Sequence, residues 1–286
     1  MVITENERNY DMKNKIAFLG VGNMAGAMLG GILSSGVFSH ENIALYNRSP
    51  QKYEKYAEYP FYIADSIASA VDFADFIVLA VKPQNYTDVL TEIKDSSVDI
   101  SNKTFISLAA GIDTKTICRC LQKNISVVRT MPNTPMLIGF GVTALSPNEY
   151  VPADDFKAVK AIFDSRGKTI CLEEDKMNAV ISVTSSSPAY IYLMIEAMLK
   201  GAQAEGIDSP ETLDIICDTL IGSAQMVKES GKTPSELIAM VKSPKGTTEQ
   251  ALIALEEHKF TESVIDAMHR CTVRAQELAK DFSDSI

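Results

Sequence analysis

A glycine-rich motif near the start of the chain carries the clearest chemical signal. The motif follows an apolar run, Ile16–Leu19, and opens a helical pattern that extends to Ser35. Its first glycine permits a tight turn, its second lets the backbone approach a pyrophosphate, and its final alanine allows a helix to pack closely on a strand. The free N–H groups at the start of that helix attract phosphate charge. The motif therefore predicts a dinucleotide site formed by Leu19, Gly20, Val21, Gly22, Asn23, Met24 and Ala25.

Three other short segments follow apolar strands in the same way. Because parallel strands end at one edge of their sheet, these segments are expected to gather beside the glycine-rich motif. Pro83 lacks an N–H group and fixes its turn, while the small side chains of Ala109 and Ala110 leave room for a bound molecule. Each segment alone is only a loop. Together they predict further cofactor contacts at Ala80, Val81, Lys82, Pro83, Ala109, Ala110 and Asn133.

The end of the second strand indicates which dinucleotide is bound. Sites that prefer NAD often have an acidic residue there, which binds the ribose 2′-hydroxyl. This chain has Asn47, Arg48 and Ser49 instead, with Lys52 nearby. A guanidinium and a hydroxyl suit a 2′-phosphate, so we expect these residues to bind NADPH in preference to NADH, which remains possible. The alternative is that Arg48 is a solvated loop residue.

Strands and helices alternate over residues 13–171, which predicts an α/β Rossmann domain with a mostly parallel, doubly wound sheet. Helical stretches are expected at residues 24–35, 84–94 and 114–122. The expected strands are Ile16–Leu19, Ile43–Tyr46, Phe76–Val81, Thr104–Ala109, Ile125–Arg129 and Gly141–Leu145.

Residues 172–286 show helix-start signals without a strand pattern, which predicts a small all-α domain. Its first part, Lys176–Glu205, is interpreted as one long helix or as two helices broken near Pro188. Later helices are expected to start at Ser209-Pro210, at the capping boxes Thr233–Glu236 and Thr247–Gln250, and at Thr261-Glu262, the last running to about Lys280. The domain is rich in Ile, Leu, Met and Ala, so we expect it to complete its core by pairing with a second copy.

The composition argues against several classes of function. The chain has 286 residues, 46% of them apolar, and a formal net charge of −10. An acidic chain repels phosphate backbones, so nucleic acid is not an expected partner. No stretch approaches the ~20 apolar residues of a membrane span. The polar N-terminus lacks the apolar core of a secretory signal, so we expect a cytoplasmic protein with a disordered lead-in at residues 1–12.

The cysteines and histidines indicate neither a disulfide framework nor a metal site. The three histidines (His40, His258 and His269) lack metal-ligand spacing and do not point to His-based catalysis. Cysteines in an odd, scattered set are expected to be reduced and to lie mostly in the core. They are Cys118, Cys120, Cys171, Cys217 and Cys271.

From about Lys15 to Ala279 the chain resembles the pyrroline-5-carboxylate reductase family. The most specific blocks are Arg129–Pro135, Ser187–Tyr190 and Val241–Thr248, with support from Leu79–Gln84 and the motif at Gly20. The resemblance implies NAD(P)H-dependent reduction of L-1-pyrroline-5-carboxylate, a cyclic imine, to L-proline in the last step of proline biosynthesis. It also implies a Rossmann domain, a helical domain that forms a homodimer, an active site at the dimer interface and, in some members, a decamer of five dimers.

The segment Ser243–Thr248 is expected to be a turn that leads into a helix, so its N–H groups form an anion site suited to a carboxylate. By resemblance, Ser243, Gly246, Thr247 and Thr248 bind the substrate, and the Thr248 hydroxyl is the catalytic group beside the imine nitrogen. The alternative is that Thr247 or Thr248 simply caps the helix. An iminium carbon is already electrophilic, so orientation of hydride and substrate suffices and no nucleophile is needed.

Several residues depart from the family pattern. Lys245 replaces a common Gly, and a positive φ there would cost a Lys on the order of 1 kcal/mol. Its ammonium could instead reach the substrate carboxylate. Further departures are Lys242 for Thr or Ser, Ile67 for an Asn at the cofactor ribose, and Ser185 and Ser187 for Gly. Two alternatives therefore stay open: a related imine or β-hydroxyacid dehydrogenase, and a catalytically weak NADP(H)-binding paralogue that acts as a sensor.

Overall fold

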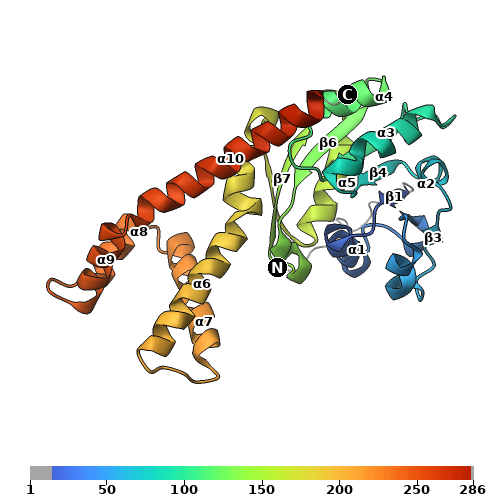
Figure 1. Ribbon diagram of the computed structural model, residues 1–286. Helices are drawn as coiled ribbons and strands as arrows, with labels where there is room; N and C mark the ends of the chain where they lie inside the picture. The colour runs from blue at the N-terminus through green and yellow to red at the C-terminus, as the bar shows by residue number, and fades with distance from the viewer. Residues whose placement is uncertain (1–14, 285–286) are drawn as a thin grey trace. The chain divides into compact units, whose positions relative to one another are not determined.

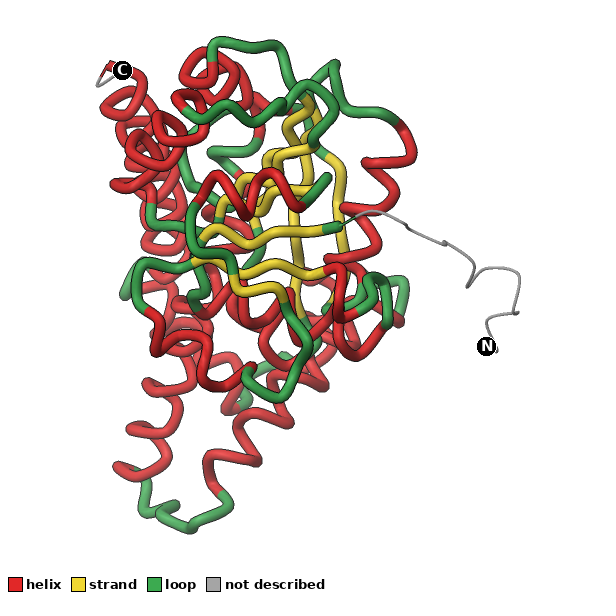
Figure 2. Tube along the Cα trace, turned by 90° about the vertical axis from the view of Figure 1, so that its right-hand side faces the viewer, coloured by secondary structure: helices red, strands yellow, loops and turns green. Residues whose placement is uncertain are grey.

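The computed structural model describes residues 15–284, and these divide into two compact units. The first unit comprises residues up to Ser186 together with those from Cys271 onward, and the second is Ser187–Arg270. The expected lead-in at residues 1–12 lies outside the described residues. The first unit is a sheet flanked by helices, and the second consists of helices (Figures 1 and 2).

The first unit is built on one eight-stranded sheet with the order β3-β2-β1-β4-β5-β6-β7-β8. Neighbouring strands are parallel except for β6 and β7, which are antiparallel. The chain moves outward from β1 to β3 and then outward from β4 on the other side, so the order reverses between β1 and β4. This confirms the predicted mostly parallel, doubly wound sheet. The strands are β1 (Ile16–Leu19), β2 (Ile43–Tyr46), β3 (Tyr62–Ile63), β4 (Phe76–Leu79), β5 (Thr104–Ser107), β6 (Ser126–Met131), β7 (Gly141–Pro147) and β8 (Gly167–Cys171).

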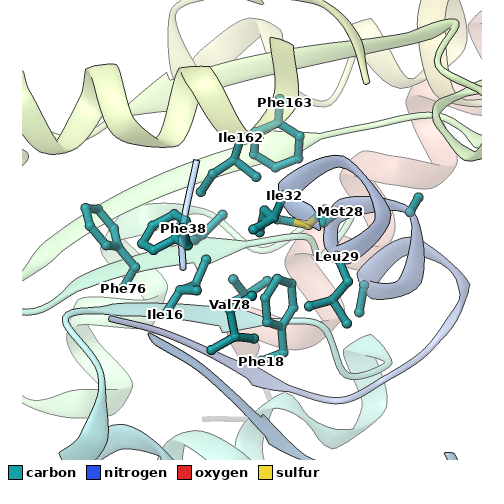
Figure 3. Packing of buried hydrophobic residues seen from close by; sticks show 14 of the residues in the cluster. Ile16, Phe18, Met28, Leu29, Ile32, Phe38, Phe76, Val78, Ile162 and Phe163 are labelled. Atoms are coloured by element: carbon teal, nitrogen blue, oxygen red, sulfur yellow. The ribbon is translucent and has the colours of Figure 1, made fainter. Parts of the chain in front are cut away.

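Apolar side chains cover both faces of the central strands. In β1, Ile16 and Phe18 belong to one buried cluster, whereas Ala17 and Leu19 belong to another on the opposite face. Burial on both faces explains why these strands are continuous apolar runs instead of alternating patterns. Figure 3 shows the first cluster, in which β1 and β4 meet side chains of α1 and α5: Met28, Leu29, Ile32, Ile162 and Phe163.

Helices cover the two faces of this sheet. α1 and α5 contribute to the first cluster, and α2, α3 and α4 contribute to the second. The helices are α1 (Asn23–Ser35), α2 (Ile67–Phe73), α3 (Tyr86–Asp95), α4 (Thr114–Leu121) and α5 (Ala153–Asp164). Shorter 3₁₀ segments are η2 (His40–Asn42), η3 (Pro50–Tyr56), η4 (Pro83–Asn85), η5 (Thr134–Ile138) and η6 (Glu174–Lys176), and η7 (Ile181–Ser185) is a π-helical turn.

Two strands lacked a usable sequence signal. β3 has two residues, both exposed, so it forms no apolar run. β8 is an edge strand with half-buried and exposed residues, and it begins at Gly167. The strands expected to reach Val81 and Ala109 instead end at Leu79 and Ser107, where the chain turns into the loops at the sheet edge.

The first unit extends past the expected boundary at residue 171. Glu174 accepts a hydrogen bond from the N–H of Thr114 (2.7 Å) and lies 3.9 Å from the guanidinium of Arg129. The same guanidinium donates to Asn178 (2.7 Å). The side chain of Arg129 is only 3% exposed, so these contacts compensate a buried charge. They hold the residues after β8 on the sheet, and α10 (Phe260–Asp284) returns to the same unit from Cys271 onward.

The second unit contains α6 (Ser187–Ala204), α7 (Thr212–Glu229), α8 (Pro234–Val241), α9 (Thr247–Glu257) and the first part of α10. Of the two alternatives for Lys176–Glu205, the one long helix is wrong and the break near Pro188 is confirmed, since α6 begins at Ser187 after the π-helical turn η7. The capping box at Thr233 is also confirmed. The start expected at Ser209-Pro210 is wrong: the Ser209 N–H donates to the Thr212 hydroxyl (3.1 Å) in a turn that precedes the helix.

Much of the apolar surface of the second unit is exposed. Within residues 187–270 only Thr212 and Ile216 are buried. Leu193, Ile221 and Val241 are each about two-thirds exposed, at 67%, 65% and 68%. No helix in the described part of the chain is long and apolar enough to cross a membrane. So large an apolar surface on a small unit indicates that a partner covers it.

The five cysteines are free thiols, but none is fully buried, so the expectation that they lie mostly in the core is wrong. Cys118 and Cys120 are half-buried beside the second cluster, and Cys271 lies beside a third. Cys171 is exposed because it lies on the edge strand β8. Among residues 15–284 no cluster of His, Cys, Asp and Glu could hold a metal ion.

Candidate active site

A cavity of about 340 Å³ lies at the carboxyl ends of β1 and β4, where the strand order reverses. Open α/β sheets bind ligands in this position. Ten of the residues predicted to contact the cofactor line it: Leu19, Gly20, Val21, Gly22, Asn47, Arg48, Ser49, Ala80, Val81 and Lys82. The fold thus brings three separate loops together, and contact of these residues with a cofactor remains a prediction.

The first two glycines of the motif have different surroundings. Gly20 has a φ of +101°, and a Cβ there would lie 2.7 Å from the carbonyl oxygen of Ala80. Gly22 is the N-cap of α1 with a φ of −88°, and a Cβ there would meet no atom within 4 Å. No side chain caps α1. The helix start therefore offers backbone donors and an open space beside them, which fit the pyrophosphate of a dinucleotide.

Asn47 joins the second strand to the motif. Its side-chain oxygen accepts a hydrogen bond from the N–H of Val21 (3.2 Å), and its amide group donates to the carbonyl of Ser49 (3.1 Å). The Tyr53 hydroxyl donates to the Asn47 carbonyl (2.8 Å). Burial raises the pKa of Tyr53, so this donor stays protonated at neutral pH. Asn47 and Tyr53 therefore fix the loop that carries Arg48 and Ser49.

Arg48 lies near an acidic residue that sequence reasoning missed. Its guanidinium is 3.7 Å from the carboxylate of Asp88, in the first turn of α3. The two side chains are 58% and 65% exposed, and exposed pairs of this kind are weak. Arg48 therefore remains available to a phosphate. Asp88 is not among the residues that line the cavity, and no local sequence pattern indicates its approach to Arg48.

Five residues that line the cavity were outside the predicted set. Lys52, noted only as a neighbour of Arg48, adds a third cation to the lining, beside Arg48 and Lys82. Asn85 and Val89 are four residues apart and so lie on one face of the segment formed by η4 and α3, a spacing that could have indicated them. The cavity residues outside the prediction are Tyr46, Lys52, Ile67, Asn85 and Val89.

Seven predicted residues do not line this cavity: Asn23, Met24, Ala25, Pro83, Ala109, Ala110 and Asn133. Ala25 is buried, in keeping with close packing of α1 on the sheet. The amide of Asn133 donates to the Thr184 carbonyl (3.0 Å) and accepts from the N–H of Val142 (2.9 Å). Nearby, the Ser185 hydroxyl donates to the carbonyl of Pro132 (3.1 Å). Asn133 thus joins β7 to η7, and a direct contact with the cofactor remains a prediction.

In the second unit, Ser243–Thr248 forms a turn that leads into α9. The helix begins at Thr247, and its N-cap is Gly246, which has no side-chain cap. The expected capping box at Thr247 is therefore wrong, and so is the alternative that either threonine is the cap, since both occupy helical positions. A Cβ at Gly246 would collide with the Ser243 side chain and lie 3.0 Å from the Ser243 carbonyl oxygen, so this close turn favours glycine.

The backbone N–H groups of this turn differ in whether they already have an acceptor. The Gly246 N–H donates to the Ser243 carbonyl (3.0 Å), so it is already engaged. The N–H groups of Thr247 and Thr248 lie in the first turn of α9, where no intrahelical acceptor exists. The side chain of Thr248 is half-buried and that of Thr247 is exposed. Two backbone donors and one adjacent hydroxyl can therefore bind a carboxylate and a neighbouring polar atom.

Lys245, Lys242 and Glu249 form one cluster beside the turn. Lys245 has a φ of +60°, the left-handed conformation in which the family usually has Gly. Its N–H donates to Oε2 of Glu249 (2.8 Å), and Oε1 lies 3.4 Å from Nζ of Lys242. The hydrogen bond from the Lys245 N–H, followed by the one from Lys242, lowers the pKa of Glu249. Glu249 is therefore ionised at neutral pH.

Comparison with known proteins assigns the chain to a family. A model described as pyrroline-5-carboxylate reductase dimerisation matches residues 174–278, and one described as NADP oxidoreductase, coenzyme F420-dependent, matches residues 15–111. The pyrroline-5-carboxylate reductase of Escherichia coli is 37% identical over 94% of this chain and 100% of that protein. Among solved structures, the NADP-bound Plasmodium falciparum pyrroline carboxylate reductase has a TM-score of 0.85 at 28% identity, covering 93% of this chain and 98% of that one. The Coxiella burnetii pyrroline-5-carboxylate reductase has a TM-score of 0.80 at 34% identity, with the same coverage. The chain belongs to the pyrroline-5-carboxylate reductase family.

Proposed function

We propose that this chain reduces L-1-pyrroline-5-carboxylate to L-proline with NADPH. The observation that carries the proposal is its 37% identity to the Escherichia coli reductase along that protein's entire length. A dinucleotide cavity in the first unit and an uncapped helix start with a hydroxyl in the second support the same chemistry. The reaction adds a hydride to the imine carbon, and when the nitrogen is already protonated this addition yields the amine directly.

The first unit binds and orients the cofactor. NADPH, when bound, supplies the hydride. Gly20 permits the close approach of its turn to Ala80, Gly22 leaves space for the pyrophosphate, and the N–H groups at the start of α1 bind its charge. Arg48, Ser49 and Lys52 bind the 2′-phosphate, which explains how this cavity can prefer NADPH over NADH.

The second unit binds the substrate. The N–H groups of Thr247 and Thr248 hold its carboxylate at the start of α9. The Thr248 hydroxyl hydrogen-bonds the ring nitrogen, so the nitrogen stays oriented as hydride arrives at the neighbouring carbon. The Gly246 N–H serves the turn itself, and Ser243 accepts its bond. Thr248 is therefore the side chain on which the reductive step depends most.

Exposed apolar side chains on the second unit support a homodimer. The exposed apolar side chains of the second unit lie in the region matched by the dimerisation model, residues 174–278. We propose that these helices pair with those of a second copy, that five such dimers can form a decamer, and that the protein is cytoplasmic. Sedimentation at micromolar concentration should give a dimer or larger species. A stable, active monomer would contradict this proposal.

The function is tested by NADPH oxidation in the presence of pyrroline-5-carboxylate, with L-proline measured as product. Turnover that depends on both reactants supports the proposal. Tight NADPH binding without turnover would instead favour a sensor, the alternative motivated by Ser185, Ser187 and Lys245. Turnover only with a β-hydroxyacid and NADP⁺ would favour the other dehydrogenase class.

A further inference from the structure

We infer that Glu249 is a positioning residue that holds the substrate turn in its binding conformation. The inference rests on the proposed function, in which this turn binds the substrate carboxylate. One side chain contacts both residues that flank Ser243-Pro244. Its Oε2 accepts the Lys245 N–H at 2.8 Å, and its Oε1 lies 3.4 Å from Nζ of Lys242. The carboxylate thus bridges the two residues on either side of Ser243-Pro244.

The bridge is needed because Lys245 has a φ of +60°. A residue with a Cβ disfavours this conformation, so without a restraint Lys245 would tend to return to negative φ. Lys245 immediately precedes Gly246, the N-cap of α9. A change in its φ would move the peptide that leads into the helix start and misdirect the N–H groups of Thr247 and Thr248. The bond to Glu249 therefore preserves the direction of the substrate donors.

Lys242 and Lys245 offset the negative charge that Glu249 places beside the substrate carboxylate. A carboxylate in the first turn of α9 is favoured by the helix dipole, yet it repels a substrate carboxylate at the same helix start. Lys242 lies against Glu249, and Lys245 adds a second cation, so two positive groups accompany one negative group. The three residues keep the turn net positive while Glu249 holds it. Glu249 thus contacts both lysines that depart from the family pattern at this turn.

The test compares Glu249→Ala and Glu249→Gln in two backgrounds. In the wild-type background, Glu249→Ala should raise the KM for pyrroline-5-carboxylate about fivefold, while kcat and the KM for NADPH change less than twofold. Glu249→Gln keeps an acceptor for the Lys245 N–H and should raise that KM about twofold. In a Lys245→Gly background glycine adopts positive φ freely, so Glu249→Ala should change the KM for pyrroline-5-carboxylate less than twofold. Glu257→Ala, at the exposed far end of α9, is the matched control and should have no effect.

Thermal unfolding of the same variants separates this inference from the proposed function. Glu249→Ala should lower the Tm in the wild-type background and leave it nearly unchanged with Lys245→Gly, whether or not the protein turns over. If the wild-type protein does not reduce pyrroline-5-carboxylate, the proposed function fails, and this cycle still decides whether Glu249 holds the turn. If an active Glu249→Ala variant had the wild-type KM for pyrroline-5-carboxylate, the inference would be overturned. In that case Glu249 would contribute to stability, seen in the Tm, without positioning the substrate turn. Equal effects of Glu249→Ala in both backgrounds would also overturn it.

Discussion

Replacing Gly20 and Gly22 by alanine, one at a time, should separate folding from cofactor binding within a single motif. At Gly20 the new Cβ would lie 2.7 Å from the carbonyl oxygen of Ala80 and 3.1 Å from the nitrogen of Val81, at a φ of +101°. These are backbone atoms that cannot rotate away. The positive φ costs about 1–2 kcal/mol, and the steric overlap costs about 1–3 kcal/mol. We therefore expect Gly20→Ala to lower the free energy of unfolding by about 2–5 kcal/mol, a large part of the total of about 5–15 kcal/mol that is typical of proteins.

Gly22→Ala should have the opposite signature. Its φ of −88° suits alanine, and the added Cβ would meet no atom within 4 Å. Alanine is a poorer N-cap than glycine, which limits the loss of stability to less than about 1 kcal/mol. The methyl group enters the open space beside the first turn of α1, where the pyrophosphate is proposed to bind. We expect the Kd for NADPH to rise at least about tenfold, or about 1.4 kcal/mol.

The assay is thermal unfolding without cofactor, at one protein concentration, together with a fluorescence titration of NADPH. Gly36→Ala is a useful control, since φ there is +69° and an added Cβ would meet no atom within 4 Å. It should show the conformational cost of about 1–2 kcal/mol alone, with NADPH binding unchanged. Wild-type NADPH affinity in Gly22→Ala, or a wild-type Tm in Gly20→Ala, would refute this account of the motif.

Three further predictions concern cofactor choice and catalysis. Arg48→Ala should raise the KM for NADPH about tenfold and that for NADH little, since only NADPH carries the 2′-phosphate; equal losses in steady-state kinetics would show that Arg48 does not bind that group. Asp88→Asn removes the carboxylate 3.7 Å from Arg48 and should raise the NADPH to NADH ratio of kcat/KM about two- to fivefold, in line with the modest energy of an exposed pair. Glu92→Gln, further along α3, is its control, and an unchanged ratio in Asp88→Asn would remove Asp88 from cofactor selection. Thr248→Ala should lower kcat about tenfold or more, a loss of at least about 1.4 kcal/mol, with little change in Tm, whereas Thr248→Ser should retain most activity; full turnover by the alanine variant would leave substrate binding to the backbone alone.

The fold was predictable where burial was complete. All four side chains of β1 are fully buried, and those of β4 nearly so, so both strands are unbroken apolar runs bounded by loops. β8 has mostly exposed or half-exposed side chains and derives its place from pairing with β7, which no local pattern encodes. The end of the first unit could not be predicted from local sequence for a similar reason. It depends on contacts of Glu174 and Arg129, which are 45 residues apart in the chain and meet only in the folded unit.

The candidate site was predictable to the extent that it is local. The glycine-rich motif and the loop at Asn47 lie next to strand ends, and both line the cavity. Asp88 could not be found this way, because its approach to Arg48 depends on how α3 packs on the sheet. At the substrate turn, the Thr-Thr-Glu-Gln pattern predicted a cap one residue too late. The close approach of Gly246 to Ser243 sets the helix start, and Glu249 reaches back to Lys245 instead of to a capping threonine.

Two of the residues that depart from the family pattern, Ser185 and Lys245, have local partners that explain how the fold accommodates them. Ser185 donates a hydrogen bond to Pro132, so its hydroxyl has a structural partner. Lys245 adopts the conformation expected of the glycine it replaces, and Glu249 holds it there. An unfavourable backbone conformation persists only where its surroundings impose it. If the turn no longer had a function, we would expect no such restraint on the positive φ of Lys245. The sensor alternative therefore loses the support of Ser185 and Lys245, two of the three substitutions that motivated it, and rests on Ser187.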